Sequence, residues 1–311
     1  MTGLLLLADV GGTYVRLRSV GPGGVVRQEV KEICPGPGDG SFPTFIRDLS
    51  DAIERSGVAR EPALAAAVIT GRAAPSALAD GDRAQVLGSL ARAGSVTLVP
   101  DGVAAYVGCL GDRPGVVVSA GTGTIAIVLD HGGRVRRLDG WGPQLGDAGS
   151  GYRVGLDGLI SACRWSDGRR GGSQLLYEAA FRAFGPVERL PWALQPVDQL
   201  RNIARFSAPV VAAARLGDVA AGRILDKAAQ ELMELAADAA GSMAGGPPPV
   251  VIAGGFVSEV PELAERVRAW CLANSQPAPV IAPASSALDG CYRIATQGVP
   301  EPFVPWVQEL K

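Results

Sequence analysis

The sequence predicts an α/β fold of two lobes, in which each lobe is a β-sheet flanked by helices. Three observations predict it. The chain has 311 residues, a length that favours two domains over one. A β-hairpin pattern occurs twice, with an offset of 110 residues between the copies. Elsewhere, apolar runs typical of buried strands alternate with segments of helical periodicity, as in layered α/β proteins.

The repeated hairpin pattern spans residues 4–26 and 114–136, and the two copies align without a gap. Each copy has an apolar run, a Gly/Thr cluster, a second alternating strand and a Gly-rich turn. The aligned pairs include Asp9 with Ser119, Gly11 with Gly121, and Gly12 with Thr122. Glycines at the first bend of each hairpin let backbone N–H groups approach a ligand closely, because no Cβ stands in the way. Two such bends that face each other would clamp a polyphosphate; the alternative is that both are ordinary turns in two similar sheets.

The first apolar run, "LLLLADVGG", is expected to be a strand and not a targeting segment. It lacks a basic n-region, is too short for a signal-peptide core, and meets Asp9 and two glycines where a cleavage site would lie. No apolar run approaches the roughly 20 residues of a membrane-spanning helix. The five cysteines are odd in number, and no two have C-x-x-C spacing. We therefore expect a reduced, cytoplasmic protein with no membrane partner.

The composition excludes several function classes. A net charge of −2 argues against nucleic acid as the main partner. Because the chain has only one histidine, His131, Ser-His-Asp catalysis is nearly excluded. We expect His131 only to lie at the tip of a hairpin. No G-x-x-x-x-G-K-[ST] motif occurs, so the chain is not a P-loop enzyme. Since the chain has only three lysines, any bound phosphate must be held by backbone amides, a metal ion or arginine.

The remaining elements continue the alternation of strands and helices. Apolar positions at helical spacing predict helices at 41–57, 82–94, 217–243, 258–273 and 286–298. Apolar runs that lead into turns predict strands at 63–75, 95–101 and 250–257. Asp218 is the expected N-cap of the helix at 217–243. Asp101 ends the strand at 95–101, where ligands of open α/β sheets bind, and is therefore a candidate site residue; the alternative is a helix N-cap.

Two motifs carry a resemblance to a known superfamily. "DVGGT" (Asp9–Thr13) and "SAGTGT" (Ser119–Thr124) resemble the two phosphate motifs of the actin, Hsp70 and sugar-kinase fold. With "VPDGVAAYVG" and "GWGPQLGDAGSGYRVGLDG" (140–158), the chain resembles the N-acetylglucosamine kinase branch, grouped with the BadF/BadG/BcrA/BcrD ATPases. The resemblance implies two actin-like (ribonuclease H-like) lobes with a cleft between them. It places the first lobe at 1–113, completed by the segment near 287–311, and the second at 114–286.

The same resemblance implies a role for each motif residue. Asp9 would hold Mg²⁺ through water, and Asp101 would be the general base that takes a proton from a sugar hydroxyl. The residues implied to bind ATP are Gly11, Gly12, Thr13, Gly121, Thr122 and Gly123 at the phosphates, and Gly254 and Gly255 at the adenosine. The residues implied to contact the substrate are Gly146, Asp147 and Thr70. Simpler alternatives are an Asx-turn for Asp147 and a plain turn for Gly254–Gly255, and Trp141 is expected to be a packing residue.

The implied function is an ATP-dependent kinase that transfers the γ-phosphate to a hydroxyl, at O6, of an amino sugar such as N-acetylglucosamine or glucosamine. The implied partners are the small-molecule sugar and a second copy in a homodimer. The chain departs from the family at Ala148, where relatives carry glutamate, in the loop 34–42, which has no asparagine, and at "TGR" (70–72), where relatives show "SGG". These departures leave the acceptor open. They also leave two alternatives: an activator-type ATPase with an iron–sulfur cluster between subunits, and a non-catalytic sensor of sugar and nucleotide.

Overall fold

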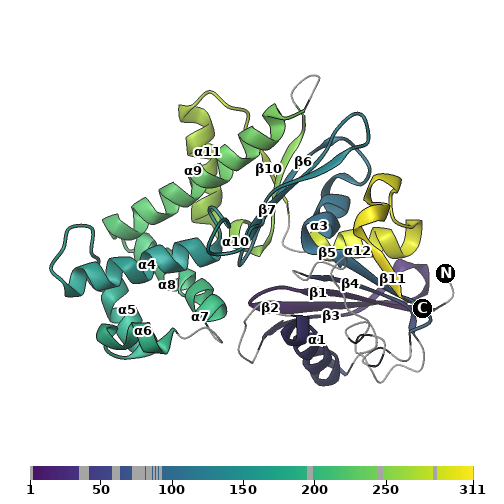
Figure 1. The fold of residues 1–311 in the computed structure, drawn as a ribbon, viewed down its shortest axis with the longest axis horizontal. Coiled ribbons are helices and arrows are strands. Elements are labelled where there is room, and N and C mark those ends of the chain that lie inside the picture. Colours follow the sequence, from purple (N-terminus) through teal and green to yellow (C-terminus); the bar gives the residue numbers. More distant parts are fainter. Residues whose placement is uncertain are drawn as a thin grey trace.

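The structure is a computed structural model that describes residues 3–34, 42–57, 64–71, 81, 86, 88, 90, 93–194, 199–243, 248–282 and 286–310. Over these residues the chain forms two mixed β-sheets with helices between and around them (Figure 1). The strand order is β11-β5-β4-β1-β2-β3 in the first sheet and β10-β9-β6-β7-β8 in the second. In each sheet an antiparallel meander continues in parallel strands beside its first strand. The shared topology confirms the predicted two-lobed α/β fold built on a repeated hairpin.

The strands of the first sheet are β1 (Leu4–Val10), β2 (Tyr14–Val20), β3 (Val26–Ile33), β4 (Leu64–Gly71), β5 (Val96–Pro100) and β11 (Gln308–Leu310). Those of the second are β6 (Gly115–Ala120), β7 (Thr124–Leu129), β8 (Val135–Asp139), β9 (Val250–Ala253) and β10 (Val280–Ile281). The larger helices are α1 (Phe42–Ser56), α3 (Asp101–Leu110), α4 (Gly151–Ser166), α5 (Gln174–Phe184), α7 (Gln199–Arg205), α8 (Ser207–Arg215), α9 (Val219–Gly241), α11 (Pro261–Ala273) and α12 (Ser286–Gln297). The short helices α6 (Leu190–Ala193) and α10 (Gly255–Ser258) complete the set used below.

The leucine run is the central strand of the first sheet, and both of its faces are buried. Leu4 and Leu6 join a core with α1, whereas Leu5 and Leu7 join a second core with α3 and α12. Successive side chains of a strand point to opposite faces, so a strand covered on both sides needs a continuous apolar run. This explains why β1 does not alternate.

The helices form layers around the two sheets. The core that contains α3 and α12 also takes in side chains of both sheets, so these two helices lie between the sheets. The helix α9 packs on the other face of the second sheet, and α11 packs against α9. In Figure 1, helices α4 to α8 gather at the end of the molecule away from the two termini. We call the part built on the first sheet with α1 the first lobe, and the part built on the second sheet with α4–α11 the second lobe.

Most predicted helices agree with the structure. Asp218 is the N-cap of α9, where its side chain accepts a hydrogen bond from the backbone N–H of Ala221, and His131 lies in the exposed β7–β8 turn, as predicted. The helix expected at 258–273 begins instead at Pro261, because proline has no N–H and fits the first turn. Most residues of the helix expected at 82–94 and most of the loop 34–42 lie outside the described residues.

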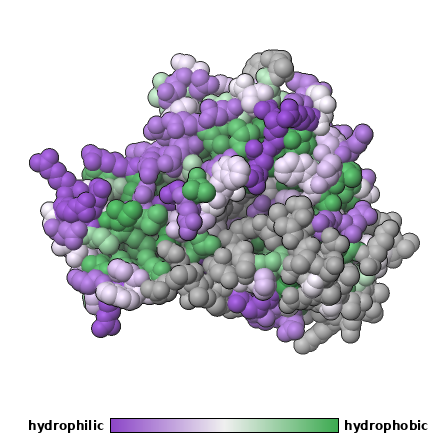
Figure 2. Space-filling model, in the orientation of Figure 1, coloured by the Kyte–Doolittle hydropathy of each residue, from purple (hydrophilic) through white to green (hydrophobic). Residues whose placement is uncertain are grey.

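The surface carries several exposed large apolar side chains. Figure 2 shows hydrophobic patches over the end of the molecule that holds α4, α5 and α8. Ile160, Trp165 and Phe181, on α4 and α5, are between 43% and 50% exposed. Among the helices of the described residues, none has both the length and the apolar character needed to cross a membrane.

Candidate active site

The first bend (Gly11–Thr13) and the second bend (Gly121–Gly123) face each other directly. The hydroxyl oxygens of Thr13 and Thr122 lie 3.0 Å apart. A Cβ on Gly12 would lie 2.7–2.8 Å from side-chain atoms of Thr122, so only glycine allows this approach. The repeated hairpins therefore bring together two backbone segments that are 109 residues apart.

A cavity of about 290 Å³ opens beside the two bends. Its lining contains Asp9, both bends, Asp101, Thr124, Gly140, Gly142, Asp147, Gly254, Ser286 and Ala287. Ten of the predicted site residues are therefore neighbours: Asp9, Asp101, Asp147, Gly254 and the six residues of the two bends. Gly255 borders a second cavity, and neither Thr70 nor Gly146 lines the first.

Asp9 is the penultimate residue of the buried strand β1 and is itself only 8% exposed. Burial raises the pKa of its carboxyl to about 6; the Arg16 guanidinium opposes the rise, and the charge of Asp101 adds to it. Arg16 lies opposite Asp9 in the β1–β2 ladder, and its Nη1 donates to Asp9 Oδ2 at 3.3 Å. A desolvated carboxylate with one partial counter-ion, facing a cavity, is suited to attract a cation.

Asp101 reaches the cavity from the end of β5, where it is the first residue of α3. Its Oδ1 accepts a 2.7 Å hydrogen bond from the N–H of Gly102. The N-cap position of α3 is taken by Pro100, so Asp101 is not the N-cap that the simpler alternative proposed. The N-terminus of a helix favours a charged carboxylate.

The loop between β8 and α4 is held by three carboxylates, of which sequence reasoning found one. Glu231 on α9 accepts from the backbone N–H of Gly149 at 2.8 Å. Asp147, at φ 60°, accepts from the backbone N–H of Thr124 at 3.1 Å, which ties the loop to the second hairpin and is not a local Asx-turn. Asp139 was missed. Its carboxylate accepts from the N–H groups of Asp147 and Ala148 at 3.0 and 3.1 Å and so closes the loop on itself. The only sequence sign of this role is that an aspartate precedes the glycine-rich "GWGPQLG" stretch.

A second cavity, of about 480 Å³, lies on the other side of the bends. Thr13, Tyr14, Gly121 and Thr122 border both cavities, so the bends form the wall between them. Its remaining lining includes Gly255, Phe256, Val211 and Ala208, which offer an apolar surface. Gly254 has φ 100°, and a Cβ there would lie 2.3 Å from the carbonyl oxygen of Ala120, so this turn requires glycine.

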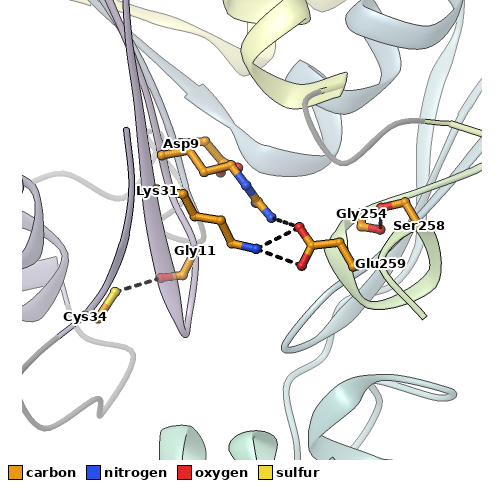
Figure 3. A network of polar contacts seen from close by, with 8 residues as sticks. Asp9, Gly11, Lys31, Cys34, Gly254, Ser258 and Glu259 are labelled. Carbon is orange, nitrogen blue, oxygen red and sulfur yellow. Dashed lines mark hydrogen bonds and ion pairs between the residues drawn. The ribbon is translucent and has the colours of Figure 1, made fainter. Parts of the chain in front are cut away.

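A polar network crosses from the first lobe to this glycine turn (Figure 3). Glu259, directly after α10, accepts hydrogen bonds from Arg16 at 3.1 Å and from Lys31 at 2.7 and 2.8 Å. The two cations hold the pKa of Glu259 below its usual value, against the effect of burial. Arg16 therefore links Asp9 to the second lobe, a role that no sequence pattern predicted.

Two buried hydroxyls near Asp9 and the cavity have no hydrogen-bond partner among the described residues. The side chain of Thr70 is fully buried on β4, next to Asp9 in the parallel ladder, and Thr124 lines the first cavity. Buried polar groups are normally satisfied, so each orphaned hydroxyl indicates a place for a ligand atom or water.

Trp141 does not pack in the interior, so that expectation was wrong. Its side chain is 66% exposed, and the Arg137 guanidinium lies 4.5 Å from the ring centroid. The flanking Gly140 and Gly142 line the first cavity. The indole of Trp141 is therefore exposed at the edge of the first cavity.

Comparisons with known proteins identify a family and similar curated proteins. The BadF/BadG/BcrA/BcrD ATPase family model matches residues 9–288. An N-acetylmuramic acid/N-acetylglucosamine kinase of Clostridium acetobutylicum is 31% identical over 148 residues, which are 46% of this chain and 48% of that protein. An N-acetyl-D-glucosamine kinase of Dictyostelium discoideum is 34% identical over 137 residues, 43% of each chain. The matched segments thus span less than half the length of these curated relatives.

A solved structure agrees with the fold over nearly the whole chain. A ROK family glucokinase from Streptomyces griseus, in complex with glucose and AMPPNP, has a TM-score of 0.64 to this structure and covers 95% of this chain and 100% of its own. The two sequences are 17% identical, so the likeness is one of fold. It confirms the predicted two-lobed α/β fold.

Proposed function

The chain belongs to the BadF/BadG/BcrA/BcrD ATPase family, and from that premise we propose that it is an ATP-dependent sugar kinase. It would transfer the γ-phosphate of ATP to a hydroxyl, at O6, of an amino sugar such as N-acetylglucosamine or glucosamine. The names of the two curated relatives support this acceptor class.

One observation carries the proposal: two aspartates and two glycine-rich bends surround one cavity. Phosphoryl transfer asks the protein mainly to position the phosphates, neutralise their charge and orient the attacking hydroxyl. Backbone N–H groups of the bends would bind the phosphates, and the carboxylates of Asp9 and Asp101 would have separate roles. Asp9 would serve the metal, and Asp101 would accept the hydroxyl proton.

The two cavities suggest how the nucleotide lies. The adenosine would occupy the larger cavity against Gly255 and Phe256, as the resemblance implies for the turn at Gly254–Gly255. Its phosphates would then run along the two bends, against their backbone N–H groups, and bring the γ-phosphate to the smaller cavity. The sugar would occupy the smaller cavity, beside Asp101 and Asp147. Gly146 and Thr70 do not line this cavity and would affect sugar binding only through the residues that do.

The residues present fit a magnesium ion. Mg²⁺ keeps several waters and is usually held by one or two carboxylates together with substrate phosphates. Asp9 offers one buried carboxylate on the cavity, and the described residues contain no cluster of three or more metal-ligating side chains that would form a cage. When bound there, the ion would neutralise charge on the β- and γ-phosphates.

Asp101 would act as the general base of the transfer. Its place at the start of α3 puts it on the lining of the cavity, and the Gly102 N–H bond holds one of its oxygens. The other oxygen would accept the proton as the sugar oxygen bonds to phosphorus and the bond to the ADP oxygen breaks. Closure of the lobes would exclude water and limit hydrolysis of ATP.

We also propose lobe boundaries at 1–113 and 114–286, with the C-terminal segment completing the first lobe. The pairing of β11 with β5 and the packing of α12 on α3 and β4 support this division. A cytoplasmic location is proposed because all five cysteines are free thiols. A homodimer remains a proposal, for which the apolar side chains on α4 and α5 offer a surface.

The decisive experiment measures ADP release with ATP, Mg²⁺ and a panel of hexoses. We expect turnover that depends on an amino sugar, with N-acetylglucosamine and glucosamine as the best acceptors. Release of ADP that no sugar stimulates would contradict the kinase proposal. An iron assay and a visible spectrum on the same protein test the activator-ATPase alternative, which requires a cluster. Binding of sugar and nucleotide without any turnover would support the sensor.

A further inference from the structure

The first bend is fixed by an arginine that comes from the other lobe. Arg201 lies on α7, in the second lobe, and is 2% exposed. Its Nε donates a 2.7 Å hydrogen bond to the carbonyl oxygen of Gly12, across 189 residues of sequence. Its Nη2 donates to the carboxylate of Asp48 on α1, in the first lobe, which is also 2% exposed.

A buried ion pair alone does not explain this arrangement. Removing two charges from water is unfavourable, and an apolar pair of the same size would often be as stable. Here the same guanidinium also donates, through Nε, to a backbone carbonyl of the first bend. Asp48 fixes the orientation of Arg201 and also pairs with Arg47 at 3.1 Å. Arg201 borders neither cavity, so its guanidinium is not placed to meet a phosphate directly. Its contribution is therefore geometric.

Holding the Gly12 carbonyl also fixes the amide that follows it. In a trans peptide the C=O and the next N–H point in opposite directions, so the bond from Arg201 sets the direction of the Thr13 N–H. Thr13 borders both cavities. Gly12 is held on its other side by Thr122 of the second bend, which leaves no room for a Cβ. Both restraints on Gly12 thus come from the second lobe.

We propose that Arg201 is a positioning residue of phosphoryl transfer: through the Gly12 carbonyl it gives the first bend its phosphate-binding geometry, and only when the two lobes are closed. This inference rests on the proposed function, and it adds a link between lobe closure and the order of the first bend. The link would keep phosphate binding weak in an open molecule.

The test compares Arg201→Lys with a matched control, Arg266→Lys. Lysine keeps a charge for Asp48 but cannot reach the carboxylate and the carbonyl with a guanidinium fork. Arg266 has the same pattern away from the cleft, donating to the Asp226 carboxylate at 2.8 Å and to the Glu262 carbonyl at 3.1 Å. For each variant, amide hydrogen exchange at residues 11–13, the affinity for AMPPNP, kcat and both KM values would be measured.

We expect Arg201→Lys to speed amide exchange at 11–13 and to weaken AMPPNP binding, each about tenfold. We expect kcat to fall roughly 10- to 100-fold, since small misplacements of reacting groups have effects of this size. The KM for the sugar and all properties of Arg266→Lys should stay close to the parent. Parental exchange and affinity in Arg201→Lys would overturn the proposal, as would equal losses in the two variants.

If Arg201→Lys does not fold, Arg201→Met combined with Asp48→Leu replaces the ion pair by apolar groups and still removes the bond to Gly12. The same faster exchange at 11–13 is then expected, and its absence counts against the proposal. Exchange and AMPPNP binding need no turnover. A parent that phosphorylates no sugar would therefore refute the proposed function while leaving the Arg201 link to be decided by these two measurements.

Discussion

At the scale of single residues, Asp9 is held in a place that disfavours its charged form. Burial raises its pKa from 3.8 to about 6, so the folded protein binds the proton more tightly than the unfolded chain does. Between these two values stability therefore falls as pH rises. At pH 7 the charged carboxylate costs about 3 kcal/mol, since one pKa unit corresponds to about 1.4 kcal/mol.

Asp9→Asn should therefore stabilise the protein at neutral pH. The amide keeps an oxygen for Arg16 and removes the buried charge, so we expect the free energy of unfolding to rise by up to about 3 kcal/mol at pH 7. The gain should shrink as pH falls below 6 and vanish near pH 4, where the parent carboxyl is protonated. Urea unfolding at several pH values measures this, and magnesium-dependent turnover should be lost. A loss of stability at pH 7 would show that Asp9 is a structural group.

Asp101→Asn separates a kinase from a sensor. The amide can still accept the Gly102 N–H bond, so the start of α3 should keep its geometry. It cannot take a proton, and we expect kcat to fall by about 10²- to 10⁴-fold with ATP affinity unchanged. Steady-state kinetics and calorimetric titration with AMPPNP give the two numbers. Full turnover in this variant would remove Asp101 from the mechanism.

At the scale of elements, the second bend tests whether the glycines serve a ligand or the fold. A Cβ on Gly121 would meet no protein atom within 4 Å, although the residue lines the cavity. Gly121→Ala should leave the melting temperature within a degree or two and raise the KM for ATP at least tenfold, because the methyl group occupies space meant for phosphate. Gly241→Ala is the control, since its Cβ is equally free and lies at the end of α9. Unchanged KM in Gly121→Ala would make the bend an ordinary turn.

The elements were predictable where the determinants are local. The hairpins, the Asp218 cap and the strand-end position of Asp101 follow from patterns a few residues long, and a short aligned repeat was enough to pair the bends. Glu259 and Arg201 were missed because each acts through a contact that only the fold creates, and Asp139 was missed because its local contacts follow no recognised turn pattern. Arg201 meets Gly12 across 189 residues, and nothing around it in the sequence indicates that it is buried.

At the scale of the whole molecule, lobe closure should make sugar and nucleotide bind cooperatively. The cavity proposed for the nucleotide is bordered by residues of both lobes, among them Arg16 and Gly255, and the Glu259 ion pairs and the Arg201 link span the same cleft. A ligand that favours the closed state therefore prepares the site for the other.

In thermal unfolding, each ligand alone at 100 times its Kd should stabilise the protein by about 2.7 kcal/mol. N-acetylglucosamine with AMPPNP should stabilise by more than the sum of the two separate effects. Strictly additive stabilisation would mean that the lobes are already closed without ligand. The same measurement with glucose in place of the amino sugar then tests whether the choice of acceptor was wrong instead.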